Sequence, residues 1–136
     1  MAHKYILDTH AFVWYLEGNK RLSKQARAII EAPDSEMILP LIALSEAALI
    51  IEKGRSSISN INFLLNRITH DPRIEIYPMT WEVFEHSLTP EALRIPELHD
   101  RLIVSTGLYL QDLGHTVSIV TKDQVITNAA VIPAIW

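Results

Sequence analysis

One apolar run near the start of the chain constrains the fold more than any other feature. The run Tyr5–Leu7 is followed directly by Asp8, Thr9 and His10. A short apolar run without alternation is typical of a strand buried on both faces, as in the parallel sheets of α/β proteins. Open α/β sheets bind their ligands at the carboxyl ends of such strands. We therefore expect Asp8 to lie at the ligand-binding edge of a parallel sheet.

The rest of the chain alternates between helix-like and strand-like segments. The expected helices cover about residues 10–16, 23–32, 41–53, 58–68, 80–88 and 99–113, and the later strands residues 37–39, 73–77, 117–120 and 131–132. In the helix that Thr80 caps, we expect Trp81 and Phe84 to face inward. Strands that alternate with helices imply crossover connections, so the pattern predicts an α/β domain with a mostly parallel sheet.

Length and composition limit the classes of protein. A chain of 136 residues predicts one domain, residues 1–136. Its apolar runs are far shorter than the ~20 residues of a membrane span, so we expect no membrane partner. The chain has no cysteine, which excludes disulfides and thiolate zinc sites and fits a cytoplasmic protein. The net charge of −4 disfavours a nucleic-acid partner unless several acids hold a metal ion.

Glu46 lies in the most apolar of the expected helices. It stands between two apolar runs with only Ser45 as a polar neighbour, and we expect this helix to be buried on most sides. An ionised carboxylate there costs on the order of several kcal/mol unless a cation compensates it. Either a cation comes to Glu46 from elsewhere in the fold, or Glu46 shares a narrow solvent-facing stripe with Lys53.

Three more acids, Asp8, Asp100 and Asp123, each have an ordinary explanation as helix caps or first-turn residues. Together with Glu46, however, they can converge in one site, because strand ends and the starts of the helices that follow them share one edge of a parallel sheet. Four such carboxylates repel one another, so at least one takes up a proton without metal. Their oxygens suit Mg²⁺ or Mn²⁺, and such ions activate water in phosphodiester cleavage.

Four short motifs follow one another along the chain. They are Tyr5–His10 with Trp14, Leu44–Glu46 with Lys53–Arg55, His99–Ile103, and Val120–Asp123. In this order they resemble the PIN domain, and within it the VapC-type ribonuclease toxins of bacterial toxin–antitoxin pairs. The resemblance implies a three-layer α/β/α sandwich around a mostly parallel sheet of four to five strands. It also implies Mg²⁺- or Mn²⁺-dependent cleavage of single-stranded or structured RNA, homodimerisation and inhibition by a cognate antitoxin.

The resemblance also implies roles for six residues. Asp8, Glu46 and Asp100 match the metal-binding core; Asp123 matches a fourth, more variable acid; Thr9 and Thr121 look like the hydroxyl residues that hold Asp8 and a metal-bound water. Asp123 either binds a second ion or positions water. Two positions depart from the family pattern: Pro40 stands where relatives often have a small polar residue, and Ser45 where this subgroup has an aromatic one.

The remaining polar and aromatic residues receive weaker assignments. Lys53 and Arg55 are placed to contact phosphate, and Arg101 either contacts the RNA backbone or pairs with an acid. His10 and His99 either contact phosphate, take up a proton, or are satisfied by local backbone groups. The four aromatic residues Phe12, Trp14, Trp81 and Phe84 are expected in the core or a dimer interface, not as platforms for base stacking.

Two other functions are open to such a sequence. A phospho-acceptor signalling domain also has a parallel sheet and an acidic Mg²⁺ site, but it needs an acidic pair after the first strand, and Asp8 has no acidic neighbour. A non-catalytic PIN-like binding module would keep the acids for structure alone. The presence of all four acids favours the nuclease.

Overall fold

The computed structural model describes residues 3–136, which form a five-stranded sheet in the order β3-β2-β1-β4-β5. The strands are β1 (Lys4–Leu7), β2 (Glu36–Pro40), β3 (Ile74–Tyr77), β4 (Val117–Val120) and β5 (Ala134–Ile135). Every neighbouring pair in this part of the chain is parallel. The sequence prediction of a mostly parallel sheet of four to five strands is confirmed.

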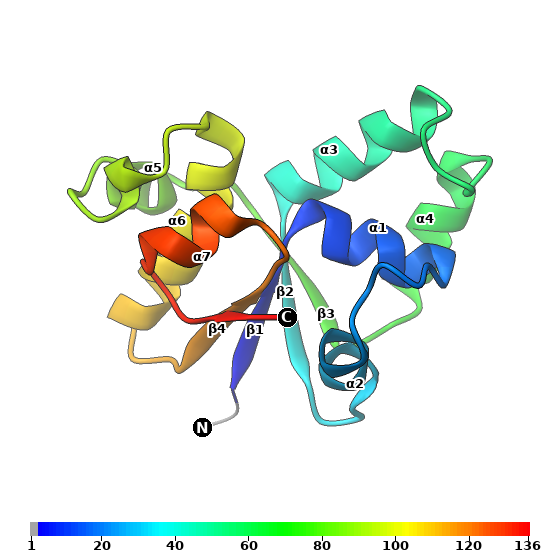
Figure 1. Ribbon diagram of the computed structural model, residues 1–136, viewed down its shortest axis with the longest axis horizontal. Coiled ribbons are helices and arrows are strands. Elements are labelled where there is room, and N and C mark those ends of the chain that lie inside the picture. The colour runs from blue at the N-terminus through cyan, green and yellow to red at the C-terminus, as the bar shows by residue number, and fades with distance from the viewer. Residues whose placement is uncertain (1–2) are drawn as a thin grey trace.

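Helices cover both faces of the sheet (Figure 1). They are α1 (Thr9–Glu17), α2 (Lys24–Glu31), α3 (Leu41–Glu52), α4 (Ile61–Thr69), α5 (Trp81–His86), the 3₁₀ turn η1 (Ala92–Arg94), α6 (Leu98–Asp112) and α7 (Gln124–Ala129). Helices α1 to α4 lie on one side and α5 to α7 on the other, which gives three layers. Of the helices formed by residues 3–136, none has the length and apolarity of a membrane span.

The order of the strands explains these layers. The connections from β1 to β2 and from β2 to β3 each move one strand toward one side of the sheet. The connections from β3 to β4 and from β4 to β5 move in the opposite direction. Because parallel crossovers are right-handed, the two directions place their helices on opposite faces. The reversal falls between β1 and β4, where Leu7 is paired with Val120. Ligands of open α/β sheets bind at this reversal, at the carboxyl ends of the strands.

The first strand is the centre of the core. Ile6 and Leu7 are completely buried, as the unbroken apolar run predicted. On one face of the sheet, α6 comes close to β1 at Gly107, where a Cβ atom would lie 3.1 Å from Cγ1 of Ile6. The same Cβ atom would lie 2.6 Å from Cδ1 of Ile132, so a larger residue at this position would require the neighbouring side chains to shift.

Most element boundaries follow the sequence signals. The Ser23 and Thr80 side chains cap α2 and α5 as predicted. The predicted strand at residues 131–132 was wrong, since β5 begins at Ala134. Helix α7 ends in the left-handed residue Ala130 (φ 51°), and Pro133 has no N–H for a strand ladder, so regular pairing starts only after the proline.

Two expectations of burial were wrong. In α3, Ala43, Ala47 and Ile51 form the buried stripe, while Leu41 and Leu49 are 42% and 48% exposed. An apolar composition therefore does not mean burial on most sides here. In α5, Trp81 is 68% exposed and Phe84 is exposed as well, because this six-residue helix turns Val83 to the interior.

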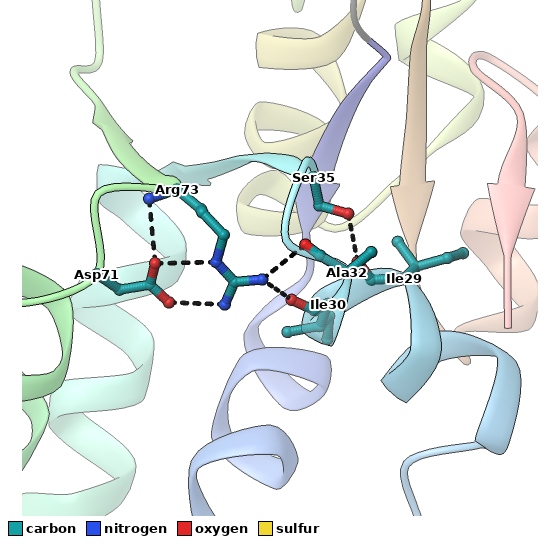
Figure 2. A network of polar contacts seen from close by, with 6 residues as sticks. All are labelled: Ile29, Ile30, Ala32, Ser35, Asp71 and Arg73. Carbon is teal, nitrogen blue, oxygen red and sulfur yellow. Dashed lines mark hydrogen bonds and ion pairs between the residues drawn. The ribbon is translucent and has the colours of Figure 1, made fainter.

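A polar network closes the amino-terminal edge of the sheet (Figure 2). The Arg73 guanidinium donates from Nε and Nη2 to the Asp71 carboxylate, at 3.1 and 2.9 Å. Its Nη1 donates to the carbonyls of Ile30 and Ala32, at 2.6 and 2.9 Å. The arginine thus satisfies carbonyls at the end of α2 and ties that helix to the start of β3.

Candidate functional site

Four acids from four separate segments meet at the opposite edge, where the strands end. Asp8 follows β1, Glu46 lies in α3, Asp100 in the first turn of α6, and Asp123 directly before α7. All four line one cavity of about 650 Å³, which we call the acidic cavity. The structure therefore brings together the acids that the sequence analysis selected.

Asp8 is held rigidly at the reversal between β1 and β4. Its Oδ1 accepts the Thr9 N–H at 2.8 Å, so it also caps α1, and its Oδ2 accepts the Thr121 hydroxyl at 2.6 Å. The Thr121 oxygen in turn accepts the Asp123 N–H at 3.0 Å. Burial raises the pKa of Asp8 above its usual value, although these hydrogen bonds oppose the effect.

Glu46 faces the acidic cavity. Its Oε1 accepts the Thr9 hydroxyl at 2.8 Å, and its Oε2 lies 3.5 Å from Nδ1 of His99. The Glu46 side chain is also 32% exposed, so it is in contact with solvent as well as with the cavity. The structure also refines the expectation for Thr9, whose hydroxyl holds Glu46 while its N–H holds Asp8.

Asp100 does not cap its helix. Glu97 takes that role, because its Oε2 accepts the Asp100 N–H at 2.7 Å. Burial, and then the charges of Asp8 and the other acids of the cavity, raise the pKa of Asp100 to about 7. Near neutral pH the acidic cavity therefore keeps a proton on a group that is normally ionised, as expected where like charges crowd together.

Asp123 caps α7, which is the ordinary role that the sequence also allowed for this acid. Its Oδ1 accepts the N–H of Ile126 at 3.0 Å. The same residue lines the acidic cavity and contributes to the raised pKa of Asp100. Capping and participation in the site are thus compatible, because a carboxylate has two oxygens.

The acids fit a divalent ion by chemistry more than by their present spacing. Among residues 3–136, no three His, Asp or Glu side chains are grouped closely enough to hold an ion as they stand. Carboxylate oxygens are nevertheless the ligands that Mg²⁺ and Mn²⁺ prefer. Burial first, and then the charges of the neighbouring acids, raise the pKa of Asp100, and a cation would offset both effects.

The structure gives the predicted cationic residues different surroundings. Arg101 donates to the carbonyls of Ile95 and Pro96, at 2.8 and 3.3 Å, and so braces the loop before α6 instead of pairing with an acid. His99 lies 3.2 Å from Glu97 through Nδ1, so its partners are acids and not local backbone groups. Lys53 and Arg55 are exposed beyond the end of α3.

Sequence reasoning missed several residues of the acidic cavity. Trp14, Lys122 and Glu97 line it, although Trp14 was expected in the core or at a dimer interface. The position of Lys122 between two selected residues was a usable signal. Trp14 belongs to the first of the four motifs and does pack against the core, but the motif did not indicate that its ring also lines the cavity.

Comparison with known proteins gives a family and several similar structures, two of which are described here. A family model described as the PIN domain matches residues 5–132. VapBC2 from Rickettsia felis, in a crystal structure bound to a DNA fragment from their promoter, is similar at 17% identity over 96% of both chains, with a TM-score of 0.70. FitAcB from Neisseria gonorrhoeae is similar at 16% identity over 96% of this chain and 95% of that chain, with a TM-score of 0.64. No curated protein matches the chain. At such identities the structural likeness shows the fold alone.

Proposed function

The chain belongs to the PIN domain family, and from this premise we propose that it is a VapC-type nuclease. In this proposal it hydrolyses phosphodiester bonds of single-stranded or structured RNA with Mg²⁺ or Mn²⁺. The observation that supports the proposal best is the meeting of Asp8, Glu46, Asp100 and Asp123 in one cavity. Burial and the charges of the neighbouring acids raise the pKa of Asp100 to about 7, and a bound cation would make the ionised carboxylates tolerable there.

Asp8, Glu46 and Asp100 would hold the ion, and Asp123 would hold a second ion or orient the attacking water. A bound divalent ion supplies a water molecule that ionises near neutral pH and stabilises negative charge on the phosphate. Thr121 and Thr9 fix the carboxylates of Asp8 and Glu46 through hydrogen bonds of 2.6 and 2.8 Å. As a ligand of that ion, Asp100 would be ionised.

We further propose that residues 1–136 are a single PIN domain that acts as the toxin of a toxin–antitoxin pair and forms a homodimer. The exposed large apolar residues on α3 and α4 are Leu41, Leu49, Phe63 and Leu65, and those on and around α5 are Met79, Trp81, Phe84, Leu88, Leu93 and Leu98. Clusters of this kind are typical of surfaces that bind other proteins. A second copy and an antitoxin would cover them.

Cleavage of a labelled single-stranded RNA tests the proposal. We expect cleavage with Mn²⁺, none with EDTA, and a rate lower by about a hundredfold or more in Asp8→Asn and Asp100→Asn, as is usual when a charged group of a catalytic centre is lost. Circular dichroism should show that both variants are folded. The matched control is Asp34→Asn, which removes an exposed carboxylate outside the acidic cavity.

An Asp8→Asn variant that cleaves RNA at the wild-type rate would contradict the proposal. No cleavage, together with no specific Mn²⁺ uptake that Asp8→Asn removes, would favour a non-catalytic module that keeps the acids for structure. Transfer of phosphate from acetyl phosphate to Asp8 would favour a phospho-acceptor domain.

A further inference from the structure

A second cavity, of about 810 Å³, adjoins the acidic cavity. His10, Trp14 and Ile50 line both, so the two form one continuous depression. The second cavity extends from α1 to the turn after α3 and reaches Arg21 and Arg55. The function proposed above uses only the acidic cavity and leaves this extension without a role.

The two cavities differ in charge. Among the described residues, the acidic cavity is lined by Asp8, Asp100, Asp123 and two glutamates, with Lys122 as its cation. In the second cavity, the exposed arginines Arg21 and Arg55 oppose the carboxylate of Glu17. The positive charge of the depression, from Arg21 and Arg55, therefore lies in the second cavity, away from the four acids.

Hydrogen bonds occupy the Glu17 carboxylate within the protein. Its Oε2 accepts the Ser56 hydroxyl at 2.7 Å and the Ser57 N–H at 3.2 Å, and its Oε1 accepts the Asn19 amide at 3.0 Å. This acid therefore anchors the turn after α3 against α1. In doing so it builds the wall that carries Arg55.

Trp14 stands where the two cavities join. Its ring centroid lies 5.8 Å from Cζ of Arg21 and 5.8 Å from Nζ of Lys122. The His10 ring, one helical turn earlier, lies 5.6 Å away. Aromatic side chains flanked by cations are what proteins use to bind single-stranded nucleic acids, since every base can stack on the ring.

We propose that the second cavity binds the nucleotide next to the cleaved phosphate, with its base on Trp14 and its outer phosphate on Arg21 and Arg55. This inference rests on the proposed function, because it takes RNA as the substrate and the acidic cavity as the site of cleavage. It replaces the earlier expectation that Trp14 serves only the core or an interface. It also shows where a protein of net charge −4 can hold a polyanion.

The geometry makes a specific demand on the substrate. A dinucleoside monophosphate has one phosphate, which the acidic cavity takes, and so nothing for the arginines to bind. A single-stranded decaribonucleotide has the outer phosphate as well. Loss of the arginines should therefore affect the long substrate and spare the short one.

The test compares Arg21→Gln/Arg55→Gln with the control Lys24→Gln/Arg94→Gln, which removes two other exposed cations that do not line either cavity. With Mn²⁺, we expect the first variant to raise KM for the decaribonucleotide about tenfold with kcat nearly unchanged. The KM for the dinucleoside monophosphate should stay within twofold of wild type. The control should match wild type on both substrates.

Trp14 is tested in the same way. Trp14→Leu should raise KM for both substrates about tenfold, since both carry the base that stacks, and Trp14→Phe should restore most of the loss. Because Trp14 is half-buried, the leucine variant can also fail to fold. The exposed arginine pair then still decides the question.

Binding of the fluorescent decaribonucleotide, followed by anisotropy in EDTA, separates the two proposals. If wild type cleaves RNA and the arginine variant keeps its KM, the second cavity is not a substrate site and the inference is overturned. If wild type cleaves nothing but binding weakens about tenfold in the arginine variant, the nuclease proposal fails and the nucleotide site stands. If binding is the same in both variants, the inference fails as well.

Discussion

Thr121 shows how much one buried hydroxyl organises at this site. It is 1% exposed, donates to the Asp8 carboxylate and accepts the Asp123 N–H. Through it, the ends of β1 and β4 and two of the four acids are fixed relative to one another. Thr121 is thus a positioning residue for Asp8.

Thr121→Val removes this hydroxyl with little change of shape. We expect kcat to fall about tenfold or more, because a carboxylate that we propose as a metal ligand loses its orienting partner. We also expect the free energy of unfolding to fall by about 1–3 kcal/mol, since one oxygen of buried Asp8 loses its donor. Single-turnover cleavage and urea unfolding measure the two effects.

Thr106→Val is the matched control, because that threonine is also buried but donates to the Leu102 carbonyl within α6. Equal losses of activity in the two variants would show that Thr121 has no special role in orienting Asp8.

Asp100 should lower the stability of the metal-free protein at high pH. Its pKa is about 7 when folded and about 4 when unfolded, so between these values the folded state binds more protons and stability falls as pH rises. Asp100→Asn should therefore stabilise the metal-free protein at pH 8, by about 1–2 kcal/mol after allowance for solvent screening. Thermal melting in EDTA at pH 4 and pH 8 checks this.

At pH 4 the difference between wild type and Asp100→Asn should nearly vanish, because Asp100 is then largely protonated in the folded state. A variant that is less stable than wild type at pH 8 would show that the Asp100 charge is compensated within the protein.

Local sequence signals identified the acids but not the directions of most side chains. Asp8 and Asp123 each follow a predicted strand, and Glu46 lies in a very apolar helix. Asp100, at the start of a helix, had an ordinary explanation and was selected only together with the other three. Arg101 follows Asp100 directly, yet adjacent helical residues point about 100° apart, so it turns to the Ile95 carbonyl.

At the scale of single elements, α2 and β3 depend on one arginine far from the acidic cavity (Figure 2). Arg73 supplies donors to two carbonyls at the end of α2 and to Asp71. The hydrogen bond from Arg73 lowers the pKa of Asp71 below its usual value. The network stabilises the amino-terminal edge of the sheet, opposite the edge where the four acids lie.

Arg73→Gln should lower the free energy of unfolding by about 1–3 kcal/mol, because partly buried carbonyls and a carboxylate lose their donors. Cleavage by the folded variant should stay near the wild-type rate. Urea unfolding measures the loss, with the exposed Arg94→Gln as control. A variant as stable as the control would show that water replaces the guanidinium without cost.

The same pair predicts a dependence on pH. A carboxyl group with a lowered pKa stabilises the folded state above its ordinary pKa of 3.8, and this contribution is lost as pH falls through the lower folded value. The gap in stability between wild type and Arg73→Gln should therefore narrow below about pH 4. A gap that stays constant from pH 7 to pH 3 would contradict this assignment.

Element boundaries were predictable where a side chain caps a helix, as Ser23 and Thr80 do. Boundaries and buried faces were not predictable where contacts with distant parts of the chain determine them. β5 begins only where Pro133 permits pairing with β4, and α3 leaves Leu41 and Leu49 exposed because of what packs on it. The spacing of apolar residues thus predicts the type of an element, but not which other elements will cover it.

At the scale of the molecule, the alternation of strands and helices was enough to predict a parallel α/β fold. It did not predict the order β3-β2-β1-β4-β5, because the pairing of β1 with β4 joins segments far apart in the sequence. That pairing brings the candidate site together, because it places Thr121 in hydrogen-bond contact with Asp8 although the two residues are 113 positions apart in the sequence.

Metal binding should stabilise the whole molecule, because ligands from both ends of the chain would bind one ion only when folded. At a free Mn²⁺ concentration about a hundred times Kd, we expect a gain of about 2.7 kcal/mol. For a chain of this length that raises Tm by about 5–10 °C. Scanning calorimetry with and without Mn²⁺ measures the shift, and Asp8→Asn should abolish it. An equal shift in the variant would indicate ions bound elsewhere.

The distribution of the four acids along the chain has a consequence for proteolysis. Asp8 and Glu46 precede β3, whereas Asp100 and Asp123 follow it, and the exposed residues Pro78 and Met79 connect the two portions. A protease that severs this connector leaves each separated fragment with half of the carboxylates. Because the pairing of β1 with β4 still holds the two portions together after the cut, the site would be lost only once the fragments separate.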